Sequence, residues 1–390
     1  MIQEPLFIIL ILTIVVTTAH LWSIRFKNAQ IMRYIPTPVW CYVPPTILTT
    51  LGVLPAQSPI YDWIARYVLP ACLILLLMTT DVKGLKQMGR LAFITILGST
   101  VTVILGAVAV FFLFRSQLGP ENWKAIGTLT ASWVGGTANE LAVKQATGLS
   151  DTLFAPLFIA DITAVYFWMT FLMILSGSQN KIDRFIHADR RQMNLILYHG
   201  RKGQADPASQ KISTRSLLSL LLIGFGMGSV SSWIGSQIPE FGMTINRTTW
   251  IIITVTTVGL TLAFTRFAGR ESPKAIKVGY ILFYFVLAST GAKANLLAIL
   301  KAPLLLGVCF VWMVVHGILL LGFGRIFRIP IALLATASQA NLGGVVSAPI
   351  VASTYEPKLI SLAVILAIFG YAIANYAGIL TAQLLQILGG

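Results

Sequence analysis

The sequence is poor in charge, and above all in negative charge. Only 11% of its 390 residues are charged, with 13 acidic against 28 basic side chains, whereas 56% are hydrophobic. The mean hydropathy is +0.81. Soluble domains carry about 25% charged residues, so this composition excludes an ordinary soluble fold. It predicts an integral membrane protein whose main surroundings are a lipid bilayer.

The net charge of +15 does not indicate a nucleic-acid partner. Lysine and arginine fall mostly in short loops and in one linker, which is the distribution that the positive-inside rule describes. No basic helix with interleaved aromatic residues is present in the sequence, and such a helix would be needed to suggest nucleic-acid binding.

The sequence also lacks the signatures of a metal site or an enzyme. Its three cysteines, Cys41, Cys72 and Cys309, sit in apolar segments without metal-ligand spacing. There is no nucleophile elbow, P-loop, zinc-protease motif or dinucleotide fingerprint. We therefore predict no metal, no cofactor, no enzymatic activity and no ATP-driven pump. The first residues lack the features of a signal peptide, so the first apolar run is expected to be a membrane helix.

Apolar stretches long enough to cross a bilayer recur along the whole chain. They predict an all-α polytopic membrane protein. The stretch 36–54 contains four prolines, so we expect it to be bent or partly unwound at its start. The predicted spans are 5–24, 36–54, 60–79, 89–114 and 151–176 in the first half, and 216–235, 248–265, 275–292, 302–324 and 358–386 in the second.

Two similar segments of small and polar residues each carry a Gly-Gly pair. Thr130–Asn139 reads TASWVGGTAN, and Thr336–Pro349 reads TASQANLGGVVSAP. Glycine costs about 1 kcal/mol relative to alanine inside a helix, and backbone freed in lipid must be buried by protein or line a wet cavity. Two matched interruptions predict the binding site of a transporter. The alternative is that the small residues only let membrane helices pack closely.

The similarity between the halves extends beyond the glycine pairs. Thr80 and Lys83 match Thr290 and Lys293 at the same offset of about 208 residues, roughly half the chain, which indicates a duplication.

The positions of the basic loops then predict how the halves are oriented. If the Gly-Gly stretches 122–148 and 330–354 are hairpins that enter and leave on one side, each half has five crossings and the basic loops all face the cytoplasm. We predict two inverted repeats, 1–176 and 216–390, joined by a cytoplasmic basic linker at 177–215. The competing geometry is a broken helix that crosses the whole membrane.

Acidic residues inside membrane segments are rare and costly, so each is a functional candidate. Asp161 lies well inside an apolar stretch and is the predicted coupling-ion residue, for sodium or for a proton. Oxygen atoms of Thr163 or Asn139 could complete a sodium shell. The alternative for Asp161 is a structural carboxylate, hydrogen-bonded in the core.

The polar residues around the glycine pairs form the predicted substrate site. Amides, hydroxyls and the N-termini of half-helices suit a substrate that bears a carboxylate. Glu140 is followed by Lys144 at i+4, so it is either a salt-bridge partner or a substrate contact. His316 is expected to be a hydrogen-bonded core histidine. The predicted substrate-binding residues are Ser132, Gly135, Gly136, Thr137, Asn139, Glu140, Ser338, Gln339, Asn341, Gly343, Gly344 and Ser347.

The turn 80–85 and the two Gly-Gly segments resemble the YjcL-like uncharacterised bacterial membrane proteins. That family looks like part of a broad superfamily of cation-proton antiporters and sodium-coupled organic anion transporters, including bile acid and glutamate symporters. The resemblance implies a core domain that moves like an elevator against a scaffold, with Asp161 at the ion-binding position. Antiporter members often carry two polar or acidic residues there, whereas Ala160 precedes Asp161, which favours a symporter.

From the sequence we expect a secondary active transporter of a small organic anion, amino-acid-like or peptide-like, in a bacterial cytoplasmic (inner) membrane. A sodium-proton antiporter and a non-transporting membrane anchor or sensor are the alternatives. The expected partners are the small-molecule substrate and the bilayer, and a homodimer is left open.

Overall fold

The computed structural model describes residues 4–25, 37–80, 89–189, 212–240, 246–294 and 302–389. Every regular element in these ranges is helical, so the predicted all-α class is confirmed for this part of the chain. The first half contains α1 (Pro5–Arg25), α3 (Thr37–Thr50), α4 (Pro59–Trp63), α5 (Leu69–Leu77), α7 (Arg90–Leu118), α8 (Asn122–Gly135), α9 (Thr137–Thr147), α10 (Asp151–Leu175) and α11 (Gln179–Phe185). The second half contains α13 (Thr214–Ser236), α14 (Arg247–Leu262), α15 (Arg266–Lys293), α16 (Ala302–Phe327), α17 (Ile331–Tyr355) and α18 (Ile360–Gly389).

Eight of the described helical segments are long and apolar enough to cross a membrane, which confirms a polytopic membrane protein. Two of the ten predicted crossings are shorter, since α3 has 14 residues and α14 has 16. Helix α3 keeps Pro44 and Pro45 in its interior. The start of the predicted stretch 36–54 is helical from Thr37 onward, so the unwinding expected there is not seen; residue 36 itself lies outside the described residues. Lys83 of the repeat lies in 81–88, also outside the described residues. Of the predicted linker, only 177–189 and 212–215 are described.

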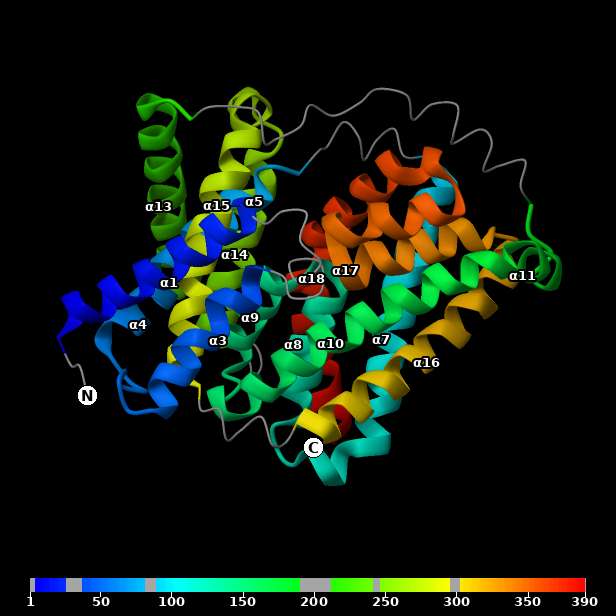
Figure 1. The fold of residues 1–390 in the computed structure, drawn as a ribbon, viewed down its shortest axis with the longest axis horizontal. Helices are drawn as coiled ribbons and strands as arrows, with labels where there is room; N and C mark the ends of the chain where they lie inside the picture. Colours follow the sequence, from blue (N-terminus) through cyan, green and yellow to red (C-terminus); the bar gives the residue numbers. More distant parts are fainter. Residues whose placement is uncertain are drawn as a thin grey trace.

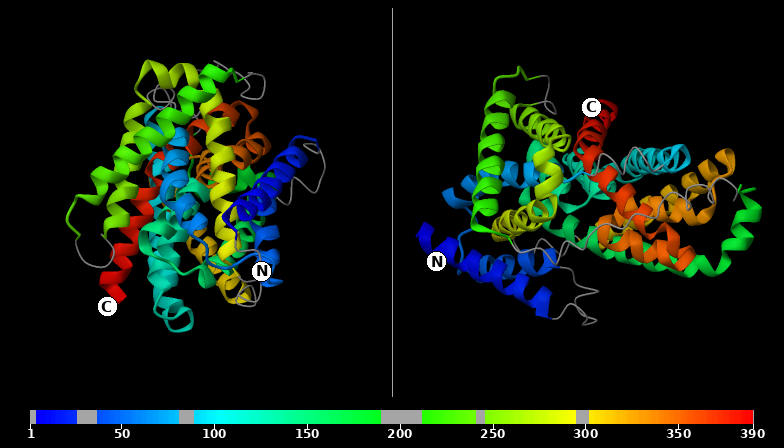
Figure 2. Two further views of the ribbon diagram at one scale, coloured as in Figure 1. Left: turned by 90° about the vertical axis from the view of Figure 1, so that its left-hand side faces the viewer. Right: turned by 90° about the horizontal axis from the view of Figure 1, so that it is seen from above.

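The helices form two bodies that lie side by side (Figures 1 and 2). One contains α1, α3, α4, α5, α13, α14 and α15, on the left of Figure 1, and the other contains α7 to α11 and α16 to α18. In the first body α13 packs on α14 and α5, and α3 packs on α15. In the second, α18 packs on α8 and α17, and α7 packs on α16. Each body therefore combines helices from both halves of the chain.

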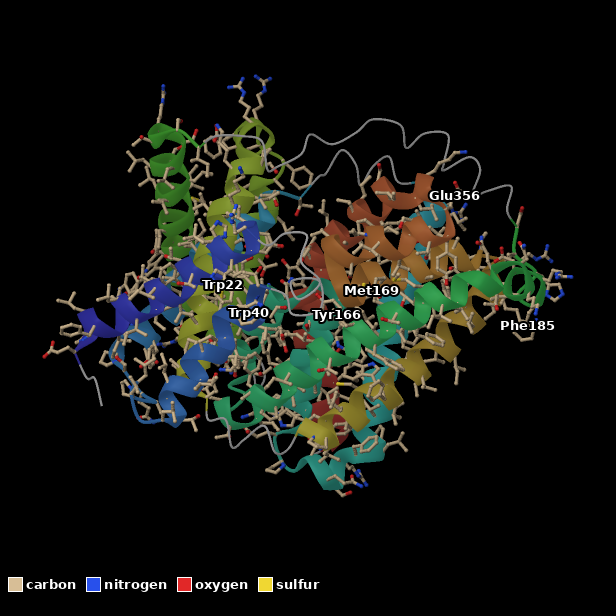
Figure 3. All side chains as sticks on the ribbon, viewed as in Figure 1. Trp22, Trp40, Tyr166, Met169, Phe185 and Glu356 are labelled. Atoms are coloured by element: carbon tan, nitrogen blue, oxygen red, sulfur yellow. The ribbon has the colours of Figure 1, made fainter. Side chains whose placement is uncertain are left out.

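The outer surface carries large apolar side chains, as expected for contact with lipid. Leu6 is 79% exposed and Leu222 is 75% exposed, on helices at the edge of the first body. Trp22, at the end of α1, packs edge-on against Trp40 of α3 with ring centroids 5.8 Å apart (Figure 3). Aromatic residues at helix ends are typical anchors at the membrane interface.

The backbones of α8 and α18 approach so closely that only glycine fits on one side. A β-carbon built on Gly127 would lie 2.5 Å from Cβ of Ala382. One built on Gly135 would lie 2.5 Å from Cβ of Ala374 and 2.7 Å from the carbonyl oxygen of Gly370. Small residues allow such approaches between membrane helices. This packing fixes the end of α8 against the middle of α18.

Helix α14 makes most of the polar contacts between the two bodies. The amide of Asn375 on α18 donates to Oγ1 of Thr256 at 2.8 Å, and the hydroxyls of Tyr376 and Thr257 share a hydrogen bond of 2.8 Å. At the start of the helix, the Asn246 amide donates to a backbone carbonyl of α9 at 3.0 Å. A small number of hydrogen bonds therefore joins the two bodies here.

Candidate functional site

Helices α8 and α9 form a hairpin with a glycine at its tip. Helix α8 ends at Gly135, and Gly136 has φ 82° and ψ 175°, a conformation that L side chains rarely adopt. At the open end of the hairpin, opposite the tip, Nζ of Lys124 donates to the carbonyl of Gly148 at 3.2 Å. The start of α8 and the end of α9 therefore lie together, so the two helices run antiparallel.

The base of this hairpin is held by polar groups around Glu121. Ser150 donates its hydroxyl hydrogen to the Glu121 carboxylate, and Lys124 forms an ion pair with it at 3.2 Å. Burial alone would raise the pKa of Glu121. The hydrogen bonds from Ser150 and Lys124 outweigh burial, so this pKa lies below the ordinary glutamate value. These contacts hold the base of the hairpin against the start of α10.

Helix α17 is sharply bent at the second predicted glycine pair. Gly344 has φ 66° and ψ −158° inside the helix. Nε2 of Gln339 donates to Oγ of Ser347 at 2.8 Å, whereas residues eight apart in a straight helix are separated by about 12 Å. A β-carbon on Gly343 would overlap both of these side chains, so the bend requires glycine here.

Both ends of α17 contact the far end of α10 and the helix that follows it. The backbone N–H of Ile331 donates to Oδ1 of Asp183 at 2.8 Å. The hydroxyl of Tyr355 donates to the carbonyl of Leu172 at 2.7 Å. The first hairpin is anchored at the beginning of α10, and α17 is anchored at its end.

The two glycine interruptions meet at one tyrosine of α18. A β-carbon built on Gly136 would lie 3.1 Å from Cε1 of Tyr371, and one built on Gly344 would lie 3.0 Å from its hydroxyl oxygen. Tyr371 also lies within electrostatic range of Tyr280 of α15, which belongs to the other body. The two interruptions, far apart in sequence, therefore converge at the boundary between the bodies.

Neither Tyr371 nor Tyr280 was among the residues predicted for the site. The signal was a Gly-Tyr pair in the middle of α18, but tyrosine in an apolar helix is usually a core residue. Only its contacts in the structure distinguish a tyrosine that meets both glycine tips from an ordinary core tyrosine.

Asp161 lies in the core, and each oxygen of its carboxylate accepts one hydrogen bond. It is 3% exposed, and it accepts hydrogen bonds from Oγ of Ser132 at 2.6 Å and from Nε1 of Trp133 at 2.7 Å. Both donors belong to the last turn of α8. Thr163 does not face Asp161 and its two donors, because its side chain is exposed and donates to a carbonyl of its own helix.

Glu140 is the second buried carboxylate of this region. It is 0% exposed, and the charge of Asp161 acts on it. Ser132 lies next to both acids, but its single hydroxyl hydrogen goes to Asp161. Neither carboxylate oxygen of Glu140 has a hydrogen-bond partner among the described residues. The ion pair between Glu140 and Lys144 that the sequence allowed does not form, since Lys144 pairs with Asp151 at 2.7 Å instead.

An isolated buried carboxylate costs several kcal/mol, so this pair of acids favours a bound cation or a proton. Buried amide oxygens near the tips have the same preference. Asn139 donates to the carbonyl of Gly135 at 2.8 Å, and Asn341 donates to two hydroxyls of α7 at 3.1 Å each. The side-chain oxygens of Asn139, Gln339 and Asn341 have no donor among the described residues. Oxygen atoms of this kind are the ligands that hard cations take.

Ser338 belongs to a different polar network. It accepts from Nε1 of Trp168 at 2.9 Å and hydrogen-bonds Nε2 of His316 at 2.9 Å. Nδ1 of His316 meets the hydroxyl of Thr102 at 2.9 Å. His316 is therefore the hydrogen-bonded core histidine expected from the sequence. It ties α7, α10, α16 and the first arm of α17 together.

Comparison with known proteins assigns the chain to a family. The profile of a family described as a protein of unknown function, DUF819, matches residues 11–388. The chain belongs to the DUF819 family. It is also 27% identical over 342 residues to the uncharacterized membrane protein YjcL of Bacillus subtilis (strain 168), with 85% of each chain covered. The predicted YjcL-like family is thus confirmed, while membership of the wider antiporter and symporter superfamily stays a prediction.

In this DUF819 protein the predicted site residues divide into two groups. Thr137 begins α9 directly after the Gly136 break and is partly exposed, next to the tips. Ser132, Asn139 and Glu140 lie deeper, with Asp161. The two buried acids, Glu140 and Asp161, therefore lie close to the first glycine tip, on and beside the helices that meet there.

Proposed function

We propose that this DUF819 protein is a secondary active transporter of a small organic anion, amino-acid-like or peptide-like, coupled to sodium or protons. The observation that carries the proposal is the convergence of Gly136 and Gly344 on Tyr371. Interrupted membrane helices need a buried or wet setting, and in transporters paired interruptions form the substrate site.

The proposal includes two inverted repeats, 1–176 and 216–390. The order of long, short and glycine-broken helices is the same in both halves. Contacts also recur: α8 packs on α18 as α17 packs on α10, and α13 packs on α5 as α1 packs on α15. Because the two glycine-broken elements are anchored at opposite ends of α10, they enter from opposite faces of the membrane.

Coupling follows from the charge of the acidic cluster. When they are ionised, Glu140 and Asp161 repel an anion at the tips. A unit charge about 10 Å away, at an effective dielectric near 20, changes binding by roughly 1.7 kcal/mol, or about twentyfold. Binding a cation or a proton at the cluster removes that repulsion. By linkage, the anion strengthens cation binding by the same factor.

The anion would be held by backbone groups. The first N–H groups of α9 follow Gly136 and have no partner within the helix, and the helix dipole favours negative charge there. Transport then requires the body containing α8 and α17 to slide against the other, as in an elevator. We place the protein in the bacterial inner membrane with linker 177–215 in the cytoplasm, since that linker is rich in basic residues.

The test uses purified protein in liposomes, with amino acids and dicarboxylates as substrates and an imposed sodium or pH gradient. Glu140→Gln should lower gradient-driven uptake at least tenfold, and Asp161→Asn should do the same. Asp62→Asn is the matched control, because Asp62 pairs with Lys293 on the surface of the other body and is 79% exposed. Uptake with unchanged ion dependence in both acidic variants would exclude the cluster from coupling.

A sodium-proton antiporter is the second candidate, and the paired buried acids favour it. It predicts that a sodium gradient moves protons through the liposome membrane without any organic solute. If no solute and no proton moves under either gradient, the chain is an anchor or sensor, the third alternative.

A further inference from the structure

The end of α11 and the turn between α16 and α17 form a tight junction at one edge of the second body. Oδ1 of Asp183 accepts a hydrogen bond from the backbone N–H of Ile331, so the Asp183 carboxylate is bound to the start of α17. Arg325 donates to the backbone carbonyl of Phe185, and its guanidinium lies 5.2 Å from that ring. Two connections far apart in sequence are thus held in a fixed arrangement.

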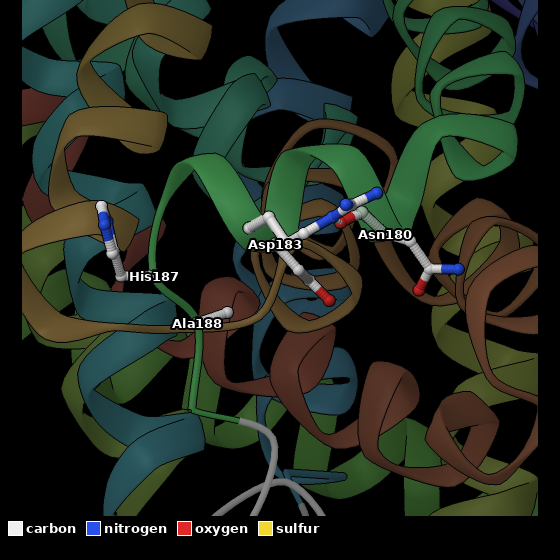
Figure 4. Close-up of a pocket in the computed structure, with 5 residues that line it drawn as sticks. Asn180, Asp183, His187 and Ala188 are labelled. Carbon is white, nitrogen blue, oxygen red and sulfur yellow. Dashed lines mark hydrogen bonds between the residues drawn. The ribbon is translucent and has the colours of Figure 1, made fainter.

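An open cavity of about 650 Å³ lies at this junction, where His187 and Asn180 flank Asp183 (Figure 4). Its lining residues are Asn180, Asp183, Arg184, His187 and Ala188. The cavity is large enough for a phosphate group and its ester substituents.

The described residues at this end include four basic side chains and three acids, a net charge of +1. Lys181, Arg184, Arg325 and Arg328 are all exposed. In the part of the chain that the structure describes, none of them forms an ion pair with a carboxylate. The guanidinium of Arg184 donates through Nε to a carbonyl of its own helix at 3.2 Å, and its side chain is exposed. The acids at this end are Asp183, Asp189 and Glu356.

Exposed apolar side chains surround the same arginines. Phe185 is 64% exposed, Ile326 is 76% exposed and Phe327 is 48% exposed. They continue the outward faces of the packed helices α10 and α16, where Ile174 is 74% exposed and Ile318 is 65% exposed. A soluble anion would leave this surface in water, whereas acyl chains would cover it.

The carbonyl of Arg328 accepts the backbone N–H of Asp189 at 2.8 Å, which brings Arg328 next to the lining residue Ala188. We propose that this junction binds an anionic phospholipid, with the phosphate at Arg184 and Arg328 and the acyl chains along α10 and α16. Guanidinium groups form paired hydrogen bonds with phosphate oxygens, and their planar shape suits such an interface. Because Asp183 holds the start of α17, the lipid would also brace the base of that bent helix. The site is independent of the proposed transport activity.

The experiment titrates full-length protein in a neutral detergent with dioleoylphosphatidylglycerol or dioleoylphosphatidylcholine, and counts bound lipids by native mass spectrometry. The variant Arg184→Gln with Arg328→Gln should bind phosphatidylglycerol about thirtyfold more weakly, since each arginine near a membrane surface contributes a factor of roughly five. The matched control, Arg115→Gln with Arg247→Gln, removes two charges at the opposite end of the helices and should bind like the parent.

Arg184→Gln alone should retain the fold and still weaken phosphatidylglycerol binding about fivefold, so a folding failure of the double variant leaves a second measurement. Soluble glycerol phosphate, at the same concentration, should not compete. Equal binding of the two lipids, equal loss in the control, or full competition by glycerol phosphate would each overturn the lipid site.

Discussion

Replacing Gly135 by alanine tests the close approach of α8 to α18 that positions the first glycine tip. The new methyl group would lie 2.5 Å from Cβ of Ala374, 2.7 Å from the Gly370 carbonyl oxygen and 2.8 Å from Cα of Tyr371. Carbon atoms in contact are normally about 3.5–4.0 Å apart. Two of these three atoms belong to the backbone, so the helices must separate by about 1 Å.

Overpacking of this kind costs typically 1–3 kcal/mol, and alanine returns up to about 1 kcal/mol through its helix propensity. We expect Gly135→Ala to lose about 1–2 kcal/mol of stability and to displace Gly136 from Tyr371. Gly226→Ala and Gly307→Ala are matched controls, because a β-carbon there meets nothing within 4 Å. They should gain up to about 1 kcal/mol.

The assay is thermal unfolding of the detergent-solubilised protein, followed by intrinsic tryptophan fluorescence, with uptake measured in parallel. If Gly135→Ala unfolds at the same temperature as the two controls, the close contact between α8 and α18 does not exist and the reasoning about the tip is refuted.

Three further substitutions test other parts of the site. Gly344→Ala should lose about 1–3 kcal/mol of stability because its positive φ strains an L residue, and a parent-like melting curve would argue against the bend. Ser338→Ala leaves buried nitrogens of Trp168 and His316 without a partner and should cost about 2–4 kcal/mol in chemical unfolding; a loss below about 1 kcal/mol would contradict the network. The lowered pKa of Glu121 means that its ionised form stabilises the fold above the ordinary glutamate pKa, and that this stability is lost as pH falls through the lowered value. Glu121→Gln should therefore flatten the acid limb of the melting-temperature profile below about pH 5, and an unchanged limb would remove Glu121 from the hairpin base.

The sequence was sufficient to predict the membrane class, most of the helices and the positions of the two glycine pairs. These features depend on local composition and on helix geometry, which short stretches determine. Gly136 and Gly344 were predictable because each belongs to a glycine pair inside an apolar segment, and because the two segments match each other across the halves of the chain.

Side-chain partners across the fold were harder to predict, because they depend on which helices become neighbours. Lys144 can reach Glu140 along one helix face, yet Asp151 lies closer once α9 turns into α10. Thr163 could have been rejected from the sequence alone, since residues two apart on a helix point in different directions and Asp161 faces the core. Tyr371 required the contact between both tips, which no local pattern contains.

The hydrogen bonds that α14 makes with α9 and α18 have an energetic consequence for any sliding motion. Four such bonds are described, one of them from Oγ1 of Thr249 to the carbonyl of Ala146 at 3.3 Å, and at about 1 kcal/mol net each they contribute about 4 kcal/mol. A ligand that prefers one arrangement by a few kcal/mol is then enough to reverse which arrangement predominates. In the transport motion proposed above, these hydrogen bonds and apolar contacts such as that of Tyr42 with Phe158, whose ring centroids are 4.6 Å apart, would have to break and form again.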